Sequence, residues 1–143
     1  MVHALEEVKR TLTQFGLLID LRPLLGNWPV EVAWGNEYRE VGRLIDLPEA
    51  LADDEAANHA IDEVARRNWF KLEQGERFSL FYSWDTASEM EEFLREEWDG
   101  FVELDERVSR AAKSAWAVAN ADARVRVRVS MIINRWRKVK KFQ

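Results

Sequence analysis

The segment FGLLIDLRPLLGNWPVEVAW, residues 15–34, decides the fold of this chain. Its first part contains LLIDL at 17–21, an apolar run without alternation, which is typical of a strand that is covered on both faces inside a parallel sheet. Such a strand normally follows other strands of its sheet, yet this one begins at residue 17. We therefore expect one edge of this strand to carry unpaired N–H and C=O groups that something else must cover.

The composition is that of a globular protein that can bury its own core. The chain has 143 residues, of which 47% are hydrophobic and 33% charged, and we predict a single domain over 1–143. The absence of cysteine excludes disulfides and thiolate metal sites and agrees with a reducing compartment. Because no apolar run is long enough to span a membrane and no signal sequence is present, we expect a cytoplasmic location and no membrane partner.

Charge is distributed unevenly along the chain. Residues 1–122 hold all 26 acidic residues and 13 of the 21 Lys and Arg, whereas 123–143 hold eight bases and no acid. A basic terminal segment can bind nucleic acid, with these residues as phosphate contacts and Trp136 as a stacking group: Arg135, Arg137, Lys138, Lys140 and Lys141. We instead favour pairing of the basic strand with acidic neighbours of its own fold, and expect no nucleic-acid partner.

The periodicity of apolar residues predicts an α+β fold with four helices and a mixed or antiparallel sheet of about five strands. The helices are predicted over 2–14, from a cap at Asp53 or Asp54 to Asn68, over 87–98 after a capping box at Thr86–Glu89, and onward from a cap at Asp105. A separate helical turn is predicted to open at Asp46 and Pro48. The strands are predicted at 17–21, 30–34, 37–45, 77–84 and 124–133, with a tight hairpin at the Gly35-Asn36 link.

The last predicted strand, in ARVRVRVSMII, alternates strictly between apolar and basic residues. This pattern indicates a long antiparallel strand with one buried face and an opposite face that carries Arg124, Arg126 and Arg128. The predicted buried face consists of Val125, Val127, Val129, Met131 and Ile133.

Four segments in this order resemble parts of the C-terminal half of class I S-adenosylmethionine-dependent methyltransferases. ALEEVKRTLTQFGLLIDLRP, residues 4–23, resembles the amphipathic helix and fifth sheet strand of that family, and VEVAWGNEYREVGRLID, residues 30–46, is similar to the hairpin inserted after that strand in one bacterial group. FSLFYSWDTASEMEEFLREEW, residues 78–98, and ARVRVRVSMIINRWRK, residues 123–138, are similar to the sixth and seventh strands. The resemblance covers nearly the whole chain and implies the C-terminal half of a Rossmann-like fold.

The chain departs from that family where the cofactor binds. Those enzymes hold S-adenosylmethionine with a Gly-rich turn after the first strand and an acidic residue that ends the second. All six glycines of this chain are isolated, and the paired glycines expected before the fifth strand appear as Phe15-Gly16. The resemblance therefore implies a half-domain without the cofactor site, so we expect no cofactor, assign no catalytic residue and lean against an enzyme.

Five residues are candidates for ligand binding. Asp20 and Arg22 lie at the carboxyl end of an apolar strand, where open sheets place ligand groups, although an internal ion pair is the reading that we favour. Trp34, Tyr82 and Trp84 could line an aromatic pocket for a flat ligand. The two histidines, His3 and His59, have no second ligand at metal spacing, and we expect no metal site.

The leading hypothesis is a non-catalytic, methyltransferase-like interaction or regulatory protein that acts as a homodimer. Its expected interface is the aromatic hairpin, represented by Trp28, Val30, Val32 and Trp34, with edge pairing of LLIDL as the other way to cover the open strand. One alternative is a small-molecule binding protein or enzyme with a pocket near Asp20, Arg22, Trp34 and Trp84. Another is the C-terminal subunit of a split methyltransferase whose N-terminal subunit is a separate partner.

Overall fold

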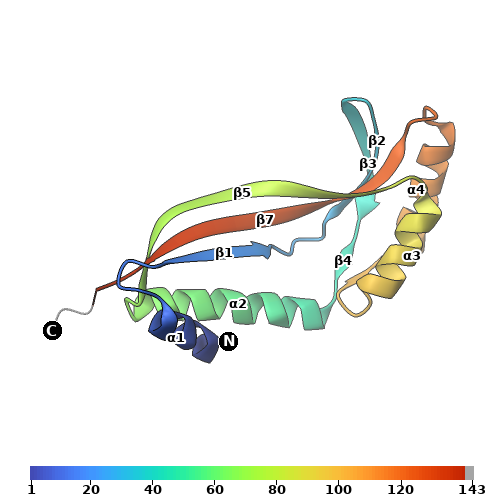
Figure 1. Ribbon diagram of the computed structural model, residues 1–143. Helices are drawn as coiled ribbons and strands as arrows, with labels where there is room; N and C mark the ends of the chain where they lie inside the picture. Colours follow the sequence, from blue (N-terminus) through green and yellow to red (C-terminus); the bar gives the residue numbers. More distant parts are fainter. Residues whose placement is uncertain (141–143) are drawn as a thin grey trace. The chain divides into compact units, whose positions relative to one another are not determined.

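The computed structural model describes residues 1–140, which adopt the predicted α+β fold (Figure 1). By internal contacts the chain divides into unit 1, residues 1–24, 52–78 and 131 onward, and unit 2, residues 25–51 and 79–130. The elements follow in the order α1 (Val2–Thr11), β1 (Leu17–Pro23), β2 (Pro29–Trp34), β3 (Glu37–Arg43), β4 (Ile45–Asp46), α2 (Pro48–Arg66), β5 (Phe70–Trp84), α3 (Ala87–Glu97), β6 (Val102–Glu103), α4 (Glu106–Val118) and β7 (Arg124–Lys138).

The main sheet has five strands, as predicted, and is organised around β7. Its order is β1-β7-β2-β3, with β5 also paired to β7, while β4 and β6 form a separate two-stranded sheet. Residues 17–23 of β1 pair antiparallel with residues 137–131 of β7, and residues 30–33 of β2 pair antiparallel with residues 127–124. Among residues 1–140, β1, β3 and β5 each have a pairing partner on one edge only.

The core of unit 1 forms where α1 and α2 meet the sheet. Trp136, Phe70 and Val64 are buried together. Apolar residues of α1 and its C-cap, of β1 and of α2, and one that precedes β5, pack around them: Leu5, Val8, Leu12, Leu18, Ile61 and Trp69. The helical spacing of Leu5, Val8 and Leu12 explains why α1 forms, since it places all three on one stripe.

The core of unit 2 lies between its strands and α3 and α4. Val30, Val32, Val125 and Val127 are fully buried, each at 0% exposure. Helix α4 packs directly on the hairpin, since a Cβ added to Gly42 would lie 2.6 Å from Val108 Cγ2. Small residues on the inner face of α4, with Ala112 at 0% exposure, permit this close approach. The predicted caps of α3 and α4, by Thr86 and Asp105, are both present.

The buried face of β7 changes along its length, which the sequence did not predict. Val125, Val127 and Val129 are buried as expected, but farther along the strand Asn134 and Trp136 are buried and Ile133 is 36% exposed. The prediction that one buried face runs through Ile133 is therefore wrong. The physical reason is that the core of unit 1 packs on the even-numbered side chains of β7, through Trp136.

Several element boundaries also differ from the predictions: α1 ends at Thr11 and not at residue 14, and β7 continues past Ile133 to Lys138. Helix α2 runs without a break from Pro48 to Arg66, so Asp53 and Asp54 lie inside it and cap nothing. Strand β5 begins at Phe70 and not at Arg77. The sequence did not indicate its first half, because the charged residues there are uncommon in strands. The strand predicted over 37–45 ends at Arg43, and Ile45 pairs instead with Glu103 of β6.

Candidate functional site

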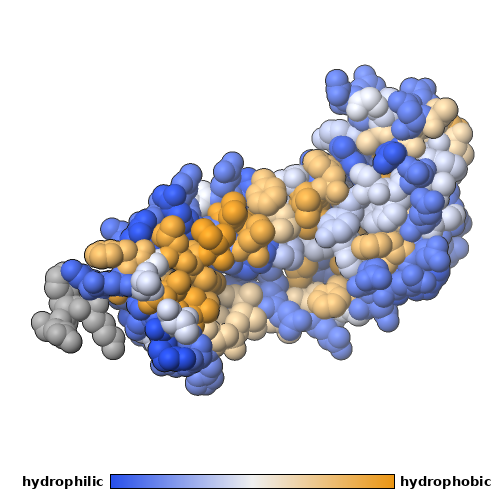
Figure 2. Space-filling view, in the orientation of Figure 1, coloured by the Kyte–Doolittle hydropathy of each residue, from blue (hydrophilic) through white to orange (hydrophobic). Residues whose placement is uncertain are grey.

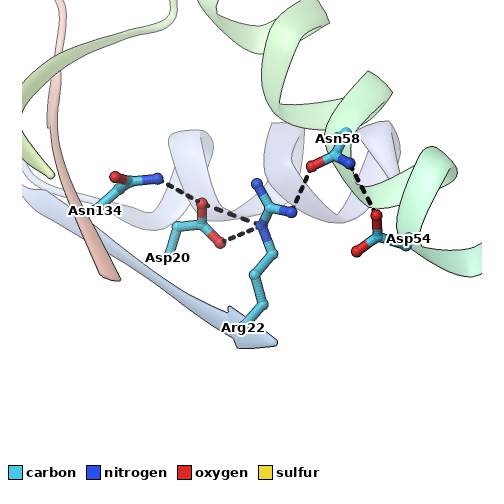
Figure 3. A network of polar contacts seen from close by, with 5 residues as sticks. All are labelled: Asp20, Arg22, Asp54, Asn58 and Asn134. Carbon is cyan, nitrogen blue, oxygen red and sulfur yellow. Dashed lines mark hydrogen bonds and ion pairs between the residues drawn. The ribbon is translucent and has the colours of Figure 1, made fainter. Parts of the chain in front are cut away.

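Asp20 and Arg22 belong to a polar network within unit 1 (Figure 3). Arg22 Nε donates to Asp20 Oδ1 at 3.1 Å, and the two side chains are only 17% and 9% exposed. Asn134 of β7 donates to Asp20 Oδ2 at 3.2 Å, and Asn58 of α2 accepts from Arg22 Nη1 at 2.5 Å. The ion pair expected from the sequence is thus confirmed, and its charges are satisfied by two amides.

The aromatic candidates belong to unit 2. Tyr82 and Trp84 stack with ring centroids 6.4 Å apart, and both contact Phe93 of α3. Trp34 instead donates from its indole nitrogen to Glu37 at 3.1 Å, across the hairpin turn. The five candidate ligand residues therefore divide into an ion pair in one unit and aromatic residues in the other. Tyr82 and Trp84 are the aromatic pair that the structure brings into contact.

Most of the hairpin residues that we expected to form the dimer interface are buried within the single chain. Val30 and Val32 are 0% exposed and Trp28 is 8% exposed within the single chain. Trp28 packs edge-on against Trp98, with ring centroids 5.5 Å apart, and α4 packs on the hairpin strands. Only Trp34, which is half-buried, retains part of its surface. The sequence could not reveal that α4 covers the face that we expected to be free.

A buried acid of unit 2, Glu31, was not recognised from the sequence. It is 0% exposed and accepts from Arg126 Nε at 2.8 Å and also from Arg128. The Arg126 guanidinium stacks over Tyr38 and Phe81, 5.0 and 4.3 Å from the ring centroids. Burial by itself would lower the pKa of Arg128, but Glu31 and Tyr38 outweigh it and raise that pKa above its ordinary value. Glu31 is therefore enclosed by arginines and not by solvent.

The basic residues of the last strand pair with acids, as we favoured. Arg135 Nε lies 3.1 Å from Glu73 Oε2, and Arg137 also binds Glu73, whose pKa is lowered chiefly by the hydrogen bond from Arg137. Trp136 is buried in the core, so it is not the exposed stacking group that a nucleic-acid site would need. Lys138 Nζ donates to the carbonyl of Leu12 at 2.6 Å. Lys141 lies outside the described residues.

An apolar patch covers the face of unit 1 opposite α1 and α2. Leu17, Ile19 and Leu21 of β1 are 41%, 52% and 56% exposed. Leu18, whose side chain points to the other face, packs in the core of unit 1. Ile133, directly opposite Leu21 on β7, extends the patch. We call these four residues the β1 surface, and Figure 2 shows apolar side chains gathered over this strand.

The backbone of β1 also has unpaired groups along one edge. Lys138 N–H donates to Gly16 O at 3.0 Å, which places the hydrogen-bonding groups of Gly16 toward β7. Because these groups alternate in an antiparallel pair, those of Leu17, Ile19 and Leu21 point to the open edge. The same three residues thus present both exposed apolar side chains and unpaired backbone groups, and this combination makes β1 the strongest candidate site.

Two classes of site receive no support from the described part of the chain. No group of three or more His, Asp or Glu side chains within residues 1–140 could hold a metal ion. None of the helices in that range combines the length and the apolar character needed to cross a membrane.

Comparisons with known proteins identify no relative from which a role could be transferred. No protein-family model, no curated protein and no solved structure matches this chain.

Proposed function

We propose that this chain is a non-catalytic interaction or regulatory protein that forms a homodimer through the β1 surface and the open edge of β1. The observation that carries the proposal is the coincidence, on one strand, of three exposed apolar side chains with an unpaired edge. Edges of this kind associate readily, because pairing with another strand satisfies their backbone groups and removes apolar surface from water.

The charge on β3 and on the first half of β5 supports the choice of β1, whereas the second half of β5 exposes the uncharged side chains of Phe78, Leu80, Phe81 and Tyr82. The first half of β5 carries exposed charged residues, namely Lys71, Glu73, Glu76 and Arg77. Strand β3 likewise exposes Glu37, Arg39, Glu40 and Arg43. Charged side chains on an edge strand oppose pairing with another chain. The exposed side chains of β1 carry no charge, so β1 lacks this protection.

The methyltransferase-like character remains part of the proposal. In its support, the segments that resemble the fifth, sixth and seventh strands of that family do form strands, and β1 and β5 both pair with β7. The cytoplasmic location is proposed on the absence of cysteine. A thermal shift assay with S-adenosylmethionine is expected to leave the melting temperature unchanged, and stabilisation by micromolar cofactor would contradict the non-catalytic role.

The homodimer is tested by light scattering after size exclusion. The wild-type chain is expected to show twice its mass of 16.8 kDa, and Ile19→Lys to show that mass once, since a lysine on an edge strand opposes pairing. Leu72→Lys is the matched control, because Leu72 is 46% exposed on β5 of the same unit and the variant adds the same charge outside the β1 surface. A monomeric wild-type chain, or equal loss of the dimer in both variants, would overturn the proposal.

A further inference from the structure

We infer that two copies join by antiparallel pairing of β1 with β1, with Ile19 on the two-fold axis, so that the sheet continues from one copy into the other. This inference rests on the proposed homodimer and specifies its register. In this register Ile19 lies opposite Ile19 of the partner subunit, and Leu17 lies opposite Leu21 of the partner subunit.

The direction of the backbone groups is the first argument for this register. The open N–H and C=O groups of β1 belong to Leu17, Ile19 and Leu21, as the bond from Lys138 N–H to Gly16 O establishes. Pairing about Ile19 matches these three residues with the same three of the second copy. Each match exchanges two hydrogen bonds, so no open group within the stretch is left without a partner.

The side chains give the second argument, because the exposed stripe is symmetric in sequence. Read in either direction, Leu17, Ile19 and Leu21 present Leu, Ile and Leu on one face. A two-fold interface must be complementary to itself, and this stripe meets that condition. Apolar and β-branched side chains then face each other across the axis, which stabilises an antiparallel pair.

Neighbouring registers are less favourable for identifiable reasons. A shift of one residue would bring the open groups of one copy against residues whose groups already bond to β7. A register centred on Asp20 would place two Asp20 carboxylates opposite each other and Leu17 opposite Pro23, which has no N–H. A register centred on Leu18 would pair Leu21 with Phe15, which lies before the strand.

Charge and chemistry favour a second copy over a strand from another protein. The stripe is complementary to its own sequence, and the nearby Asp20 and Arg22 are already paired with each other within the chain. The β1 surface itself contains no charged residue, so nothing on it requires a partner of opposite charge. The other possible occupant of this edge is a strand from a separate subunit. Light scattering that finds the wild-type chain monomeric by itself would point to that occupant.

The absence of cysteine allows a direct test of the register by disulfide formation. Purified Ile19→Cys is oxidised mildly and run on a non-reducing gel, and most of it is expected as a crosslinked dimer, since opposite Cα atoms in an antiparallel pair lie about 5.5 Å apart. Leu21→Cys is the matched control. In the inferred register the two cysteines at position 21, one from each copy, are offset by four residues along the strands. This offset is about 13 Å, which is too far for a disulfide.

A mixture makes the test more specific. Chains with Leu17→Cys and chains with Leu21→Cys are each expected to remain uncrosslinked alone and to crosslink when mixed. A wild-type dimer in which Ile19→Cys fails to crosslink, or in which Leu21→Cys crosslinks with itself, would overturn the register and leave the homodimer intact. A wild-type monomer by light scattering would overturn both. Light scattering of Ile19→Cys under reducing conditions shows whether the substitution itself prevents association.

Discussion

Arg22 of β1 donates from Nη1 to Asn58 Oδ1 of α2 at 2.5 Å, and this bond ties the strand to the helix beneath it. Asn58 in turn donates to Asp54 at 3.2 Å, so its amide uses both of its polar ends (Figure 3). The inner face of β1 is thereby fixed while its outer face stays exposed. An edge strand that is hydrogen-bonded to its own helix loses less conformational freedom on pairing with a second strand than an untethered one.

Asn58→Ala is expected to destabilise unit 1 by about 1–3 kcal/mol, because it leaves part of the Arg22 guanidinium without its acceptor in a poorly hydrated place. Urea unfolding followed by fluorescence measures the change. His59→Ala, at the next and exposed position of α2, is the matched control and is expected to stay within about 0.5 kcal/mol. Equal effects of the two substitutions would show that the network does not stabilise the strand.

Much of the fold could be predicted from local pattern, because each helix and strand has its own periodicity. The capping box from Thr86 to Glu89 and the cap at Asp105 were identified from residue type alone. The change of buried face along β7 could not be, since Val129 and Ile133 look equivalent in an alternating sequence. What distinguishes them is the helix layer that packs on each part of the strand, and this depends on contacts distant in sequence.

The candidate site was predicted only in part, for the same reason. The open edge of β1 was expected, but the prediction that LLIDL is covered on both faces inside a parallel sheet was wrong. Leu17, Ile19 and Leu21 are 41%, 52% and 56% exposed, and β1 pairs antiparallel with β7. The choice of the hairpin as the interface was wrong, because Val30 and Val32 are covered by α4, which follows them by more than seventy residues. The buried Glu31 was not recognised at all, because the residues that enclose it, Arg126 and Arg128, lie 95 and 97 positions away in the sequence.

Glu31→Gln is expected to destabilise unit 2 by about 3–5 kcal/mol, because it removes the charge that compensates Arg126 and Arg128 in a buried place. Chemical denaturation gives the loss as a lower midpoint with an unchanged slope. The control is Asp85→Asn, which removes a carboxylate 3.2 Å from Arg124 where the two side chains are 71% and 61% exposed. That exposed pair is expected to contribute at most about 1 kcal/mol. Similar losses for the two variants would mean that burial does not strengthen the Glu31 pair.

Glu63 provides the pH dependence of α2. Hydrogen bonds from Arg66 and then Arg67 lower the pKa of Glu63 from 4.5 to about 2. The distances are 2.7 Å to Arg66 Nη2 and 2.5 Å to Arg67 Nε, at helical spacings of three and four residues. Since the folded state holds the carboxylate more firmly in its ionised form, the contribution of Glu63 is complete above its ordinary pKa of 4.5 and is lost as the pH falls toward about 2.

Glu63→Gln should therefore lower the melting temperature at neutral pH, and the difference from the wild-type chain should shrink between pH 4.5 and about 2. Thermal unfolding followed by circular dichroism at a series of pH values measures this convergence. Glu55→Gln, which removes a carboxylate exposed on the same helix, is expected to show a smaller difference at neutral pH, since no arginine bond to it is lost. If the two melting curves for Glu63→Gln and wild type stayed equally far apart down to the lowest pH, the arginine contacts would not be the source of the stabilisation. Salt should reduce the neutral-pH difference as well, because both arginines are exposed and their attraction to Glu63 is screened.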